Sequence, residues 1–389
     1  MCRNSMAKIA IVANSTWNIF NFRMNILRAL EAEGHDIIVI APIDKYIFYL
    51  NECNNVRHIS LKSLSRKSLN PIKDTLLFFE FYRVLRFEKP DLVLNYTVKP
   101  NIYANMAARF LDIPSICVVT GLGYAYIKGG WLESLTSLLY KISFRSAKKV
   151  VFENTDDRLL FSSKKIADPA QCISIKGCGI NTGFFKPIPP QNKPENKIIF
   201  SFIGRFLYDK GVKEFVEAAK IIRSKHPHTE FRLIGEIDPD NPATVLEDEL
   251  LQWVNEKVVD DRGPSSDVRE EIRNSDCIIF PSYREAIARV LQEAMAMEKP
   301  VITTDVAGCR EAVDHGENGF LVPVKNSAAL AECIDRFLTL SVQERELMGR
   351  KGRQKVESEF DENIISDFFV GLINELLPIR NKYAGKKSS

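Results

Sequence analysis

Short apolar runs alternate with segments of helical periodicity along almost the whole chain. Residues 9–13 form one run, residues 37–41 form the next, and the segment between them repeats apolar residues at helical spacing (Phe22, Ile26, Leu27 and Leu30). Continuous apolar strands separated by helices are typical of parallel sheets, whose crossover connections cover both faces. We therefore expect an α/β protein built from doubly wound parallel sheets.

The same alternation predicts strands at residues 92–95, 116–119, 149–152, 198–203, 231–234, 277–280, 301–304 and 320–322. Asn70 and Pro71 suit the cap and first turn of a helix that continues to about Arg86. The strand pattern is interrupted at residues 184–197, where FFKPIPPQNKPENK carries four prolines and few large apolar side chains. Such a composition is typical of a linker between folded units.

The chain of 389 residues exceeds the length at which a single core stops growing, roughly 250 to 300 residues. We predict an N-terminal domain at 1–186, a linker at 187–196 and a C-terminal domain at 197–360. In the last segment, 361–389, we expect a helix that returns to the N-terminal domain, followed by a basic tail.

Composition excludes several classes of protein. Lys and Arg number 53 against 50 Asp and Glu, and a net charge of +3 is too small to attract nucleic acid. The eight cysteines are scattered without a C-x-x-C pair, which indicates reduced thiols in a cytoplasm. No run reaches the roughly 18 apolar residues needed to span a bilayer. We expect a cytoplasmic protein without a nucleic-acid partner.

Two glutamates flank the start of a predicted helix in the segment 277–305. Glu285 lies in the turn and Glu293 lies inside the helix, ~12 Å apart if the segment between them is helical. Carboxylates that work together on one glycosidic bond lie ~5–9.5 Å apart, so these two are not an acid/base pair. A helix N-terminus between them suits phosphate. A sugar near Glu285, a diphosphate at the helix start and a ribose near Glu293 would fit this segment. Three residues between the glutamates are predicted to bind substrate as well: Ala286, Ile287 and Ala288. Two surface glutamates on an ordinary crossover helix are the alternative.

A basic cluster, GRFLYDKG at 204–211, directly follows the strand predicted at 198–203. Open α/β sheets bind ligands at the carboxyl ends of their strands. Gly204, Arg205 and Lys210 are therefore candidates for a diphosphate, to which each charge-assisted hydrogen bond contributes roughly 1.5–3 kcal/mol. The alternative is a solvated basic loop with a glycine helix cap. Because the basic cluster occurs together with the two glutamates, we favour a binding site.

Four segments together resemble the retaining glycosyltransferases of family 4, in order and in spacing. They are IKGCGINTGFF (175–185), FIGRFLYDKG (202–211), PSYREAIARVLQEAMA (281–296) and PVITTDVAGCREAVDHGENGFLVP (300–323). The resemblance implies the GT-B fold, in which two Rossmann-like doubly wound domains face a central cleft. It also implies a retaining reaction from a nucleotide-sugar.

The resemblance assigns roles to the candidate residues of the C-terminal half. Arg205 and Lys210 would bind the donor diphosphate, and Glu285 would bind hydroxyls of the transferred sugar. These three are the catalytic candidates, and Glu293 would bind the nucleotide ribose. A loop around Arg262 and Gly263, after the strand-like residues 257–259, would form the wall of the base site.

The N-terminal half resembles a narrower group that extends polyprenyl-diphosphate-linked sugars, similar to bacterial N-acetylgalactosaminyltransferases. The segments are NSTWNIFNFR (14–23), LNYTVKPNIYANMAAR (94–109) and TGLGYAYI (120–127). This resemblance implies a UDP-sugar donor, an N-acetylhexosamine, and a lipid-linked saccharide acceptor.

Five residues of these segments are candidates for substrate binding, because each follows a predicted strand: Lys99, Asn101, Thr120, Gly121 and Gly123. Glycines let backbone N–H groups approach a ligand closely. A plain turn around Gly121, and a helix cap for Asn101, are the alternatives.

An apolar stripe precedes several basic residues in the segment 131–149: Trp131, Leu135, Leu138, Leu139 and Ile142, then Lys141, Arg145, Lys148 and Lys149. A basic amphipathic helix can lie on an anionic bilayer, which predicts peripheral contact with the cytoplasmic face of an inner membrane. The alternative is a crossover helix whose apolar stripe faces the core.

Some residues depart from the family pattern. Ala286 and Ala288 stand where the family usually has Gly and Pro, which raises a catalytically weakened UDP-sugar-binding protein as one alternative; a nucleotide-sugar epimerase is another. Asp238 and Asp240 form a D-x-D pair that binds metal in other glycosyltransferases. The surrounding IDPDNP is rich in turn residues, so we expect neither a metal nor a cofactor.

Overall fold

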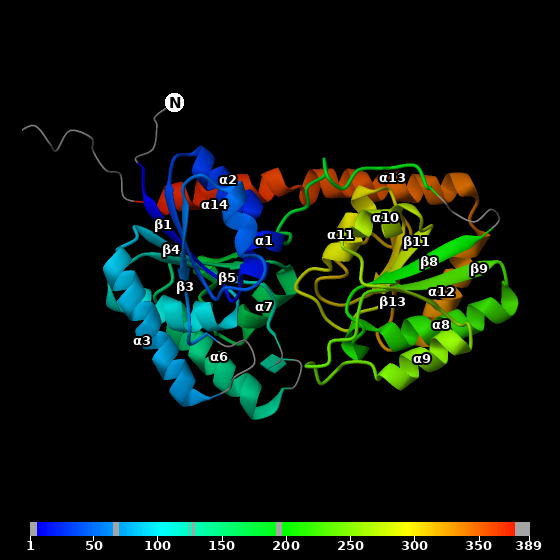
Figure 1. Cartoon of the computed structure of the whole chain (residues 1–389), viewed down its shortest axis with the longest axis horizontal. Helices are drawn as coiled ribbons and strands as arrows, with labels where there is room; N and C mark the ends of the chain where they lie inside the picture. Colours follow the sequence, from blue (N-terminus) through cyan, green and yellow to red (C-terminus); the bar gives the residue numbers. More distant parts are fainter. Residues whose placement is uncertain (1–5, 65–69, 124, 127–128, 192–196, 378–389) are drawn as a thin grey trace, which may run out of the picture. The chain divides into compact units, whose positions relative to one another are not determined.

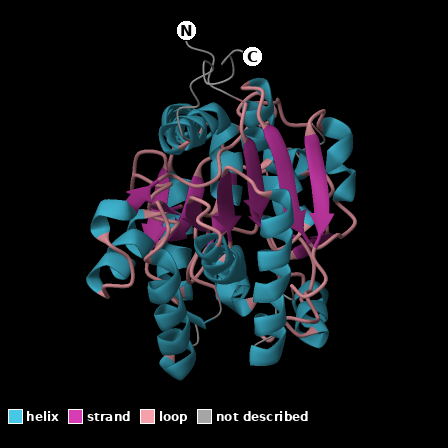
Figure 2. Ribbon diagram, turned by 90° about the vertical axis from the view of Figure 1, so that its left-hand side faces the viewer, coloured by secondary structure: helices cyan, strands magenta, loops and turns pink. Residues whose placement is uncertain are grey.

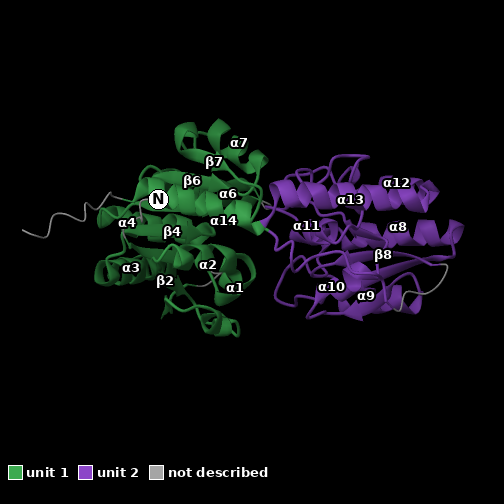
Figure 3. Cartoon of the chain, turned by 90° about the horizontal axis from the view of Figure 1, so that it is seen from above, with its two compact units in different colours: residues 1–179, 362–389 green, residues 180–361 purple. Residues whose placement is uncertain are grey.

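The computed structural model describes residues 6–64, 70–123, 125–126, 129–191 and 197–377. The chain divides into two compact units (Figure 3). Unit 1 comprises residues 1–179 and 362–389, and unit 2 comprises residues 180–361. Each unit contains one sheet, and the paired strands in both sheets run parallel (Figure 1).

The sheet of unit 1 has the strand order β3-β2-β1-β4-β5-β6-β7. Its strands are β1 (Lys8–Val12), β2 (Asp36–Ala41), β3 (Val56–Ser60), β4 (Leu92–Tyr96), β5 (Ser115–Val119), β6 (Lys149–Phe152) and β7 (Cys172–Ser174). Alternate residues enter opposite cores: Ile9 and Ile11 pack in one, Ala10 and Val12 in the other. Helices therefore cover both faces of the sheet (Figure 2).

The helices of unit 1 fall into two layers. One contains α2 (Met24–Ala32) and α14 (Glu362–Leu376), which pack against each other. The opposite layer contains α3 (Pro71–Glu88), α4 (Asn105–Phe110), α6 (Gly130–Phe144) and α7 (Thr155–Ser163). Shorter helical segments are α1 (Thr16–Phe22), η1 (Ile47–Glu52), the π-helical turn η2 (Pro100–Ala104) and η3 (Pro169–Gln171).

The sheet of unit 2 has the order β10-β9-β8-β11-β12-β13. Its strands are β8 (Ile198–Ile203), β9 (Thr229–Ile234), β10 (Asp260–Gly263), β11 (Cys277–Phe280), β12 (Val301–Thr304) and β13 (Gly319–Val322). Its helices are η4 (Tyr208–Lys210), α8 (Val212–Lys225), α9 (Glu247–Asn255), α10 (Val268–Arg273), α11 (Arg289–Ala296), α12 (Ser327–Thr339) and α13 (Val342–Glu359). Both sheets are thus doubly wound α/β.

The boundary between the units differs from the predicted linker. The chain passes from unit 1 to unit 2 between Gly179 and Ile180, not at 187–196. Ile180 and Phe185 are buried in the core of unit 2, which attaches this stretch to the second unit. Of the predicted linker, residues 187–191 belong to unit 2 and residues 192–196 lie outside the described ranges.

The chain returns to unit 1 at Glu362, where α14 begins. The side-chain amide of Asn25, on α2, donates to the carbonyls of Cys178 and Glu362. This amide therefore holds together the two points at which the chain leaves and re-enters unit 1. Residues 378–389, the predicted basic tail, lie outside the described ranges.

Glu298 has a φ of +57°, in the left-handed region that favours glycine. It follows α11, which ends at Ala296. Left-handed backbone costs a non-glycine residue ~1–3 kcal/mol, but glycine also increases the conformational entropy of the unfolded chain, which offsets part of that gain. Glu298→Gly should therefore raise the free energy of unfolding by about 0.5–1 kcal/mol. Urea titration measures the change. Glu346→Gly, inside α13, is the opposite control and should lower it by about 1 kcal/mol.

His58, on β3, makes two hydrogen bonds with its ring nitrogens, and burial favours its neutral form. Its Nε2–H donates to the Ala41 carbonyl at 3.0 Å, so Nδ1 accepts from the Tyr49 hydroxyl at 2.9 Å. Burial lowers the pKa of His58 below its ordinary 6.5, against smaller opposing effects of the Ala41 carbonyl and the Asp44 carboxylate.

This lowered pKa makes stability depend on pH. The unfolded chain takes up a proton at His58 near pH 6.5 and the folded chain does not, so stability is lost as the pH falls from 6.5 through the lowered pKa. We expect His58→Gln to flatten the decline of the melting temperature between pH 7 and pH 5. His228→Gln, at an exposed histidine of unit 2, should leave the decline as in the wild type; equal profiles for all three proteins would contradict the prediction.

Candidate active site

An ion pair between Lys210 and Glu285 forms the centre of the candidate site in unit 2. Lys210 ends η4, just after β8, and Glu285 lies in the loop between β11 and α11. The Lys210 Nζ and the Glu285 Oε1 are 2.5 Å apart, and the side chains are only 21% and 14% exposed. The hydroxyl of Ser282 also lies 2.7 Å from Oε1. Our sequence analysis did not single out Ser282; its position three residues before Glu285, in the same turn, is the only signal.

The loop carrying Lys210 meets the loop carrying Glu285 through a glycine. Gly211 has a φ of +76°, and a Cβ on it would lie 2.0 Å from the carbonyl oxygen of Pro281. The backbone N–H of Tyr283 donates to the Asp209 carbonyl at 2.9 Å. Only a residue without a side chain permits this approach, which brings together groups 75 residues apart in sequence.

A second glycine supports Glu285 from the loop after β12. Gly308 has a φ of +73°, and a Cβ there would lie 2.5 Å from the Glu285 carbonyl oxygen. Glu285 and Ala288 donate their backbone N–H groups to the carbonyls of Ala307 and Gly308, respectively. The N–H of Ala288, one of the three predicted substrate-binding residues between the glutamates, is therefore engaged within the protein.

Ala286 is not among the described non-glycine residues with positive φ. The backbone strain that would make alanine unfavourable at this position is thus absent. The close backbone approach in this part of the site occurs instead at Gly308.

Asp209 connects Arg205 with the central ion pair. Burial raises the pKa of Asp209; the charges of Lys210 and Arg205 lower it and that of Glu285 raises it, so all four groups are within electrostatic reach of one another. Its Oδ1 is buried with no hydrogen-bond partner in the described part of the chain. Arg205 itself is exposed, and its Nη1 lies 2.6 Å from the Asp238 Oδ2. The two predicted diphosphate-binding cations therefore each have a carboxylate partner.

Glu293 lies in α11, five residues after its cap residue, Ala288. No side chain caps this helix, so its start retains the positive partial charge on which the predicted phosphate site depends. The Arg289 Nε lies 2.8 Å from the Glu293 Oε1. Burial raises the pKa of Glu293, and the charge of Arg289 opposes that shift. Ile287 lies between the two glutamates and is half-buried.

Arg262 and Gly263 are part of strand β10 rather than of a loop after a strand at 257–259. The prediction failed because β10 is an edge strand with polar residues, which carries no apolar signal. Three glycines lie at the carboxyl ends of neighbouring strands: Gly204 follows β8, Gly235 follows β9 and Gly263 ends β10. The Gly204 N–H donates to the Ile234 carbonyl, and the Gly235 N–H donates to the Gly263 carbonyl. A Cβ on Gly235 would lie 1.9 Å from the Gly204 oxygen. Bare backbone thus lines the carboxyl ends of β8, β9 and β10.

Two predicted residues of unit 1 have structural partners. Asn101 is fully buried and donates to the Val118 carbonyl of β5 at 2.8 Å. It lies inside η2 rather than at its cap, so the helix-cap alternative is wrong, and its role in substrate binding stays a prediction. Lys99 lies 2.6 Å from the Asp74 Oδ1, and the Tyr103 hydroxyl donates to the other oxygen of that carboxylate. Lys99 therefore needs to exchange Asp74 for any substrate anion.

Thr120, Gly121 and Gly123 follow β5, as predicted from the strand pattern. Gly121 and Gly123 have φ values of +97° and +71°, which explains why glycine occupies both positions. Tyr124 and Ile127 of the same motif lie outside the described residues. The neighbouring strand end contains Thr97, a β-branched residue at a φ of +71° that our sequence analysis missed. Backbone strain of this kind concentrates at functional sites.

Both halves of the chain match models of glycosyltransferases. Residues 8–154 match "Glycosyl transferase 4-like", and residues 185–355 match "Glycosyl transferases group 1". The chain is also 30% identical to N,N'-diacetylbacillosaminyl-diphospho-undecaprenol alpha-1,3-N-acetylgalactosaminyltransferase of Campylobacter jejuni, over 95% of its own length and 99% of that enzyme. The chain belongs to this glycosyltransferase family.

Solved structures of other glycosyltransferases have the same fold as this chain. A glycosyltransferase from Rickettsia africae superposes with a TM-score of 0.79 at 21% identity, over 97% of this chain and 100% of the other. HepE from Anabaena, in complex with UDP-glucose, superposes with a TM-score of 0.74 at 17% identity, over 95% and 100%. The enzyme thus has the GT-B fold with two Rossmann-like domains, which confirms the predicted fold class.

Proposed function

We propose that this glycosyltransferase moves an N-acetylhexosamine from UDP to a polyprenyl-diphosphate-linked saccharide, with retention at the anomeric carbon. The central observation is the Lys210–Glu285 ion pair, which sets a phosphate-binding cation beside a hydroxyl-binding carboxylate. The acceptor class is supported by the Campylobacter relative, whose name specifies a diphospho-undecaprenol acceptor and N-acetylgalactosamine transfer. The donor nucleotide is supported by the HepE complex with UDP-glucose.

The site acts by exchanging ion-pair partners. The donor diphosphate takes the Lys210 ammonium, and the guanidinium of Arg205 turns from Asp238 to the same diphosphate. Glu285 is then released to accept hydrogen bonds from hydroxyls of the sugar. As the bond between sugar and phosphate breaks, the two cations and the start of α11 stabilise the charge that develops on UDP. On the same face of the sugar, the acceptor hydroxyl oxygen bonds to the anomeric carbon as the bond to the UDP phosphate breaks, and that phosphate takes the hydroxyl proton.

Glu293 fits the ribose end of the donor. Its carboxylate is fixed by Arg289, which counteracts the increase of its pKa by burial and so favours the ionised form that accepts hydroxyl hydrogen bonds. The backbone of Gly204, Gly235 and Gly263 offers a surface on which a flat base can lie. Arg262, half-exposed on β10, borders that surface.

The reaction that we propose requires no metal. In the proposed mechanism, the leaving diphosphate has two cationic side chains as counter-ions, Arg205 and Lys210. We therefore expect turnover to remain within twofold of its initial value after treatment with EDTA and desalting. Loss of turnover that Mg²⁺ restores would contradict this expectation.

A lipid-linked acceptor would place the enzyme at the cytoplasmic face of an inner membrane, as a peripheral protein. The function is tested by mass spectrometry of the products formed from a panel of UDP-sugars and a short lipid-diphosphate saccharide. We expect one added N-acetylhexosamine and UDP release that depends on acceptor, both lost in Glu285→Gln. Epimerised donor without acceptor would indicate an epimerase, and UDP binding without release would indicate a binding protein.

A further inference from the structure

Helix α6 exposes an apolar stripe. Trp131, Leu135, Leu138 and Ile142 follow one another at intervals of four, three and four residues, which places them along one side of the helix, and they are 37–69% exposed. The opposite side of α6 faces the core through Leu132, Tyr140 and Phe144. Four of the five residues of the predicted stripe are therefore exposed, whereas Leu139 packs against the core. Helix α6 is thus a crossover helix that faces the core on one side and exposes most of the predicted stripe on the other.

Helix α3 carries a matching stripe that the sequence pattern did not reveal. Ile72, Leu76 and Phe79 have the same spacing, and Phe87 continues the stripe two turns later; all four are 56–83% exposed. The core-facing side consists of Leu77, Phe81 and Leu85. Because apolar residues are distributed around most of α3, its helical periodicity does not distinguish an exposed stripe from a buried one.

The two stripes lie on the same side of unit 1. Helix α3 connects β3 to β4 and α6 connects β5 to β6, with α4 packed between them. Figure 1 shows α3 and α6 below the sheet, opposite α2 and α14. Since both helices turn their other side to the sheet, the stripes point away from it. We call these residues the α3–α6 surface: Ile72, Leu76, Phe79, Phe87, Trp131, Leu135, Leu138 and Ile142.

Unpaired cations surround the α3–α6 surface. Within the described ranges, no acidic side chain pairs with Lys73, Arg83, Arg86, Lys141 or Arg145. The carboxylates of the same two helices are all engaged: Asp74 with Lys99, Glu80 with the backbone N–H groups of Lys62 and Ser63, Glu88 with Arg57, and Glu133 with Lys164. The surface therefore combines exposed apolar side chains with positive charge.

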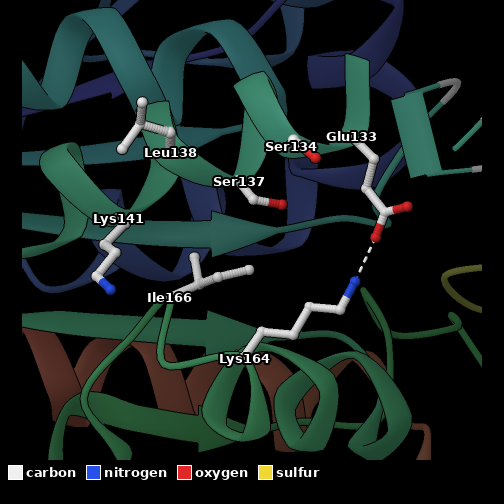
Figure 4. Close-up of a pocket in the computed structure, with 7 residues that line it drawn as sticks. All are labelled: Glu133, Ser134, Ser137, Leu138, Lys141, Lys164 and Ile166. Carbon is white, nitrogen blue, oxygen red and sulfur yellow. Dashed lines mark hydrogen bonds and ion pairs between the residues drawn. The ribbon is translucent and has the colours of Figure 1, made fainter. Parts of the chain in front are cut away.

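A pocket of about 340 Å³ opens beside this surface, between α6 and the end of α7 (Figure 4). Lys141 contributes an ammonium group to its lining, and Ser134 and Ser137 contribute hydroxyls. The ammonium of Lys164 also lines the pocket and is paired there with the carboxylate of Glu133. Leu138, of the apolar stripe, borders the same pocket. Ammonium and hydroxyl groups next to an apolar side chain suit a phosphate that is attached to a lipid.

We propose that the α3–α6 surface docks on an anionic phospholipid bilayer. Apolar side chains enter the interface between head groups and acyl chains, the cations pair with lipid phosphates, and Trp131 lies at head-group depth, where tryptophan is enriched. No helix in the described ranges is long and apolar enough to span a bilayer. This proposal rests on the proposed function and deepens it. Both helices begin on the side of the sheet where the strands have their carboxyl ends, and a lipid-linked acceptor would be bound on that side.

Flotation with vesicles tests the proposal with the full-length protein. We expect binding to vesicles of phosphatidylglycerol and phosphatidylethanolamine, and at least tenfold weaker partitioning onto pure phosphatidylcholine. Leu76→Ser combined with Leu135→Ser, one change in each helix, should weaken partitioning at least tenfold. Leu251→Ser combined with Leu347→Ser is the matched control, because these helical leucines of unit 2 are 52% and 47% exposed, against 56% and 46% for the tested pair.

Tryptophan fluorescence locates the contact independently of flotation. Anionic vesicles should shift the emission of the wild type to the blue, and Trp131→Phe should abolish the shift while the protein still floats. Equal partitioning of the two leucine double variants, or a wild type that floats with neither vesicle, would overturn the proposal. Self-association through this surface without vesicle binding would overturn it as well.

Turnover separates this proposal from the proposed function. With a short soluble acceptor, the Leu76 and Leu135 double variant should match the wild type, and with acceptor embedded in vesicles it should lose at least tenfold. If neither protein turns over either acceptor, the proposed function fails, whereas flotation and fluorescence still decide the docking surface.

Discussion

Lys210→Ala is expected to lower acceptor-dependent UDP release about 1,000-fold at saturating donor, because one preorganised group that stabilises developing charge contributes a factor of roughly 10²–10³ in turnover. The loss is placed at the upper end because the substitution also leaves Glu285 without its cation, at 14% exposure. The turnover number is the relevant measurement, since diphosphate stabilisation grows as the bond to the sugar breaks.

Lys220→Ala is the matched control for this experiment. Lys220 is also a lysine of unit 2 in an ion pair, 2.8 Å from Glu256, but both side chains are more than 40% exposed. Its removal should change turnover by less than twofold and leave the melting temperature close to that of the wild type. Turnover of Lys210→Ala within tenfold of the wild type, in a protein that melts normally, would remove Lys210 from the site.

Arg23→Ala should lower the free energy of unfolding of unit 1 by about 3–5 kcal/mol, because it leaves a buried carboxylate without its counter-ion. Arg23 and Glu153 are 2% and 5% exposed and 3.0 Å apart, and the Arg23 guanidinium lies over the Tyr96 ring, 4.1 Å from its centroid. Burial raises the pKa of Glu153, and Arg23 opposes that shift. Urea titration followed by circular dichroism measures the loss.

Two further variants separate the ion pair from simple loss of packing. Arg28→Ala, which removes an exposed partner of Glu52, should cost less than about 1 kcal/mol. Replacing both buried partners, by Arg23→Met with Glu153→Leu, should restore most of the stability, because no unpaired charge then remains. A double variant as unstable as Arg23→Ala would show that packing, rather than charge, accounts for the loss.

The strands could be predicted where they are buried on both faces. The bounds of β6, β8, β11 and β12 agree with the predicted 149–152, 198–203, 277–280 and 301–304, because a buried parallel strand is a continuous apolar run. The edge strands β3 and β7 were missed, since a sheet edge is partly exposed and tolerates polar residues such as Arg57 and His58.

Residue types and loop positions of the candidate site could also be predicted, but side-chain partners could not. The meeting of Lys210 with Glu285 depends on Gly211 and Gly308 accepting close backbone contacts from distant loops. Arg205 with Asp238, and Asn101 with Val118, are likewise partners set by tertiary packing. Local spacing contains no information about such contacts.

The structure pairs Glu285 with Lys210. A free hexose, which carries no phosphate, would have to separate the two charges without offering the ammonium a new anion. In the proposed mechanism a nucleoside diphosphate supplies that anion, so the carboxylate would become accessible to hydroxyls only once the nucleotide has entered. Selection against the abundant monosaccharides of a cell would then need no additional gate.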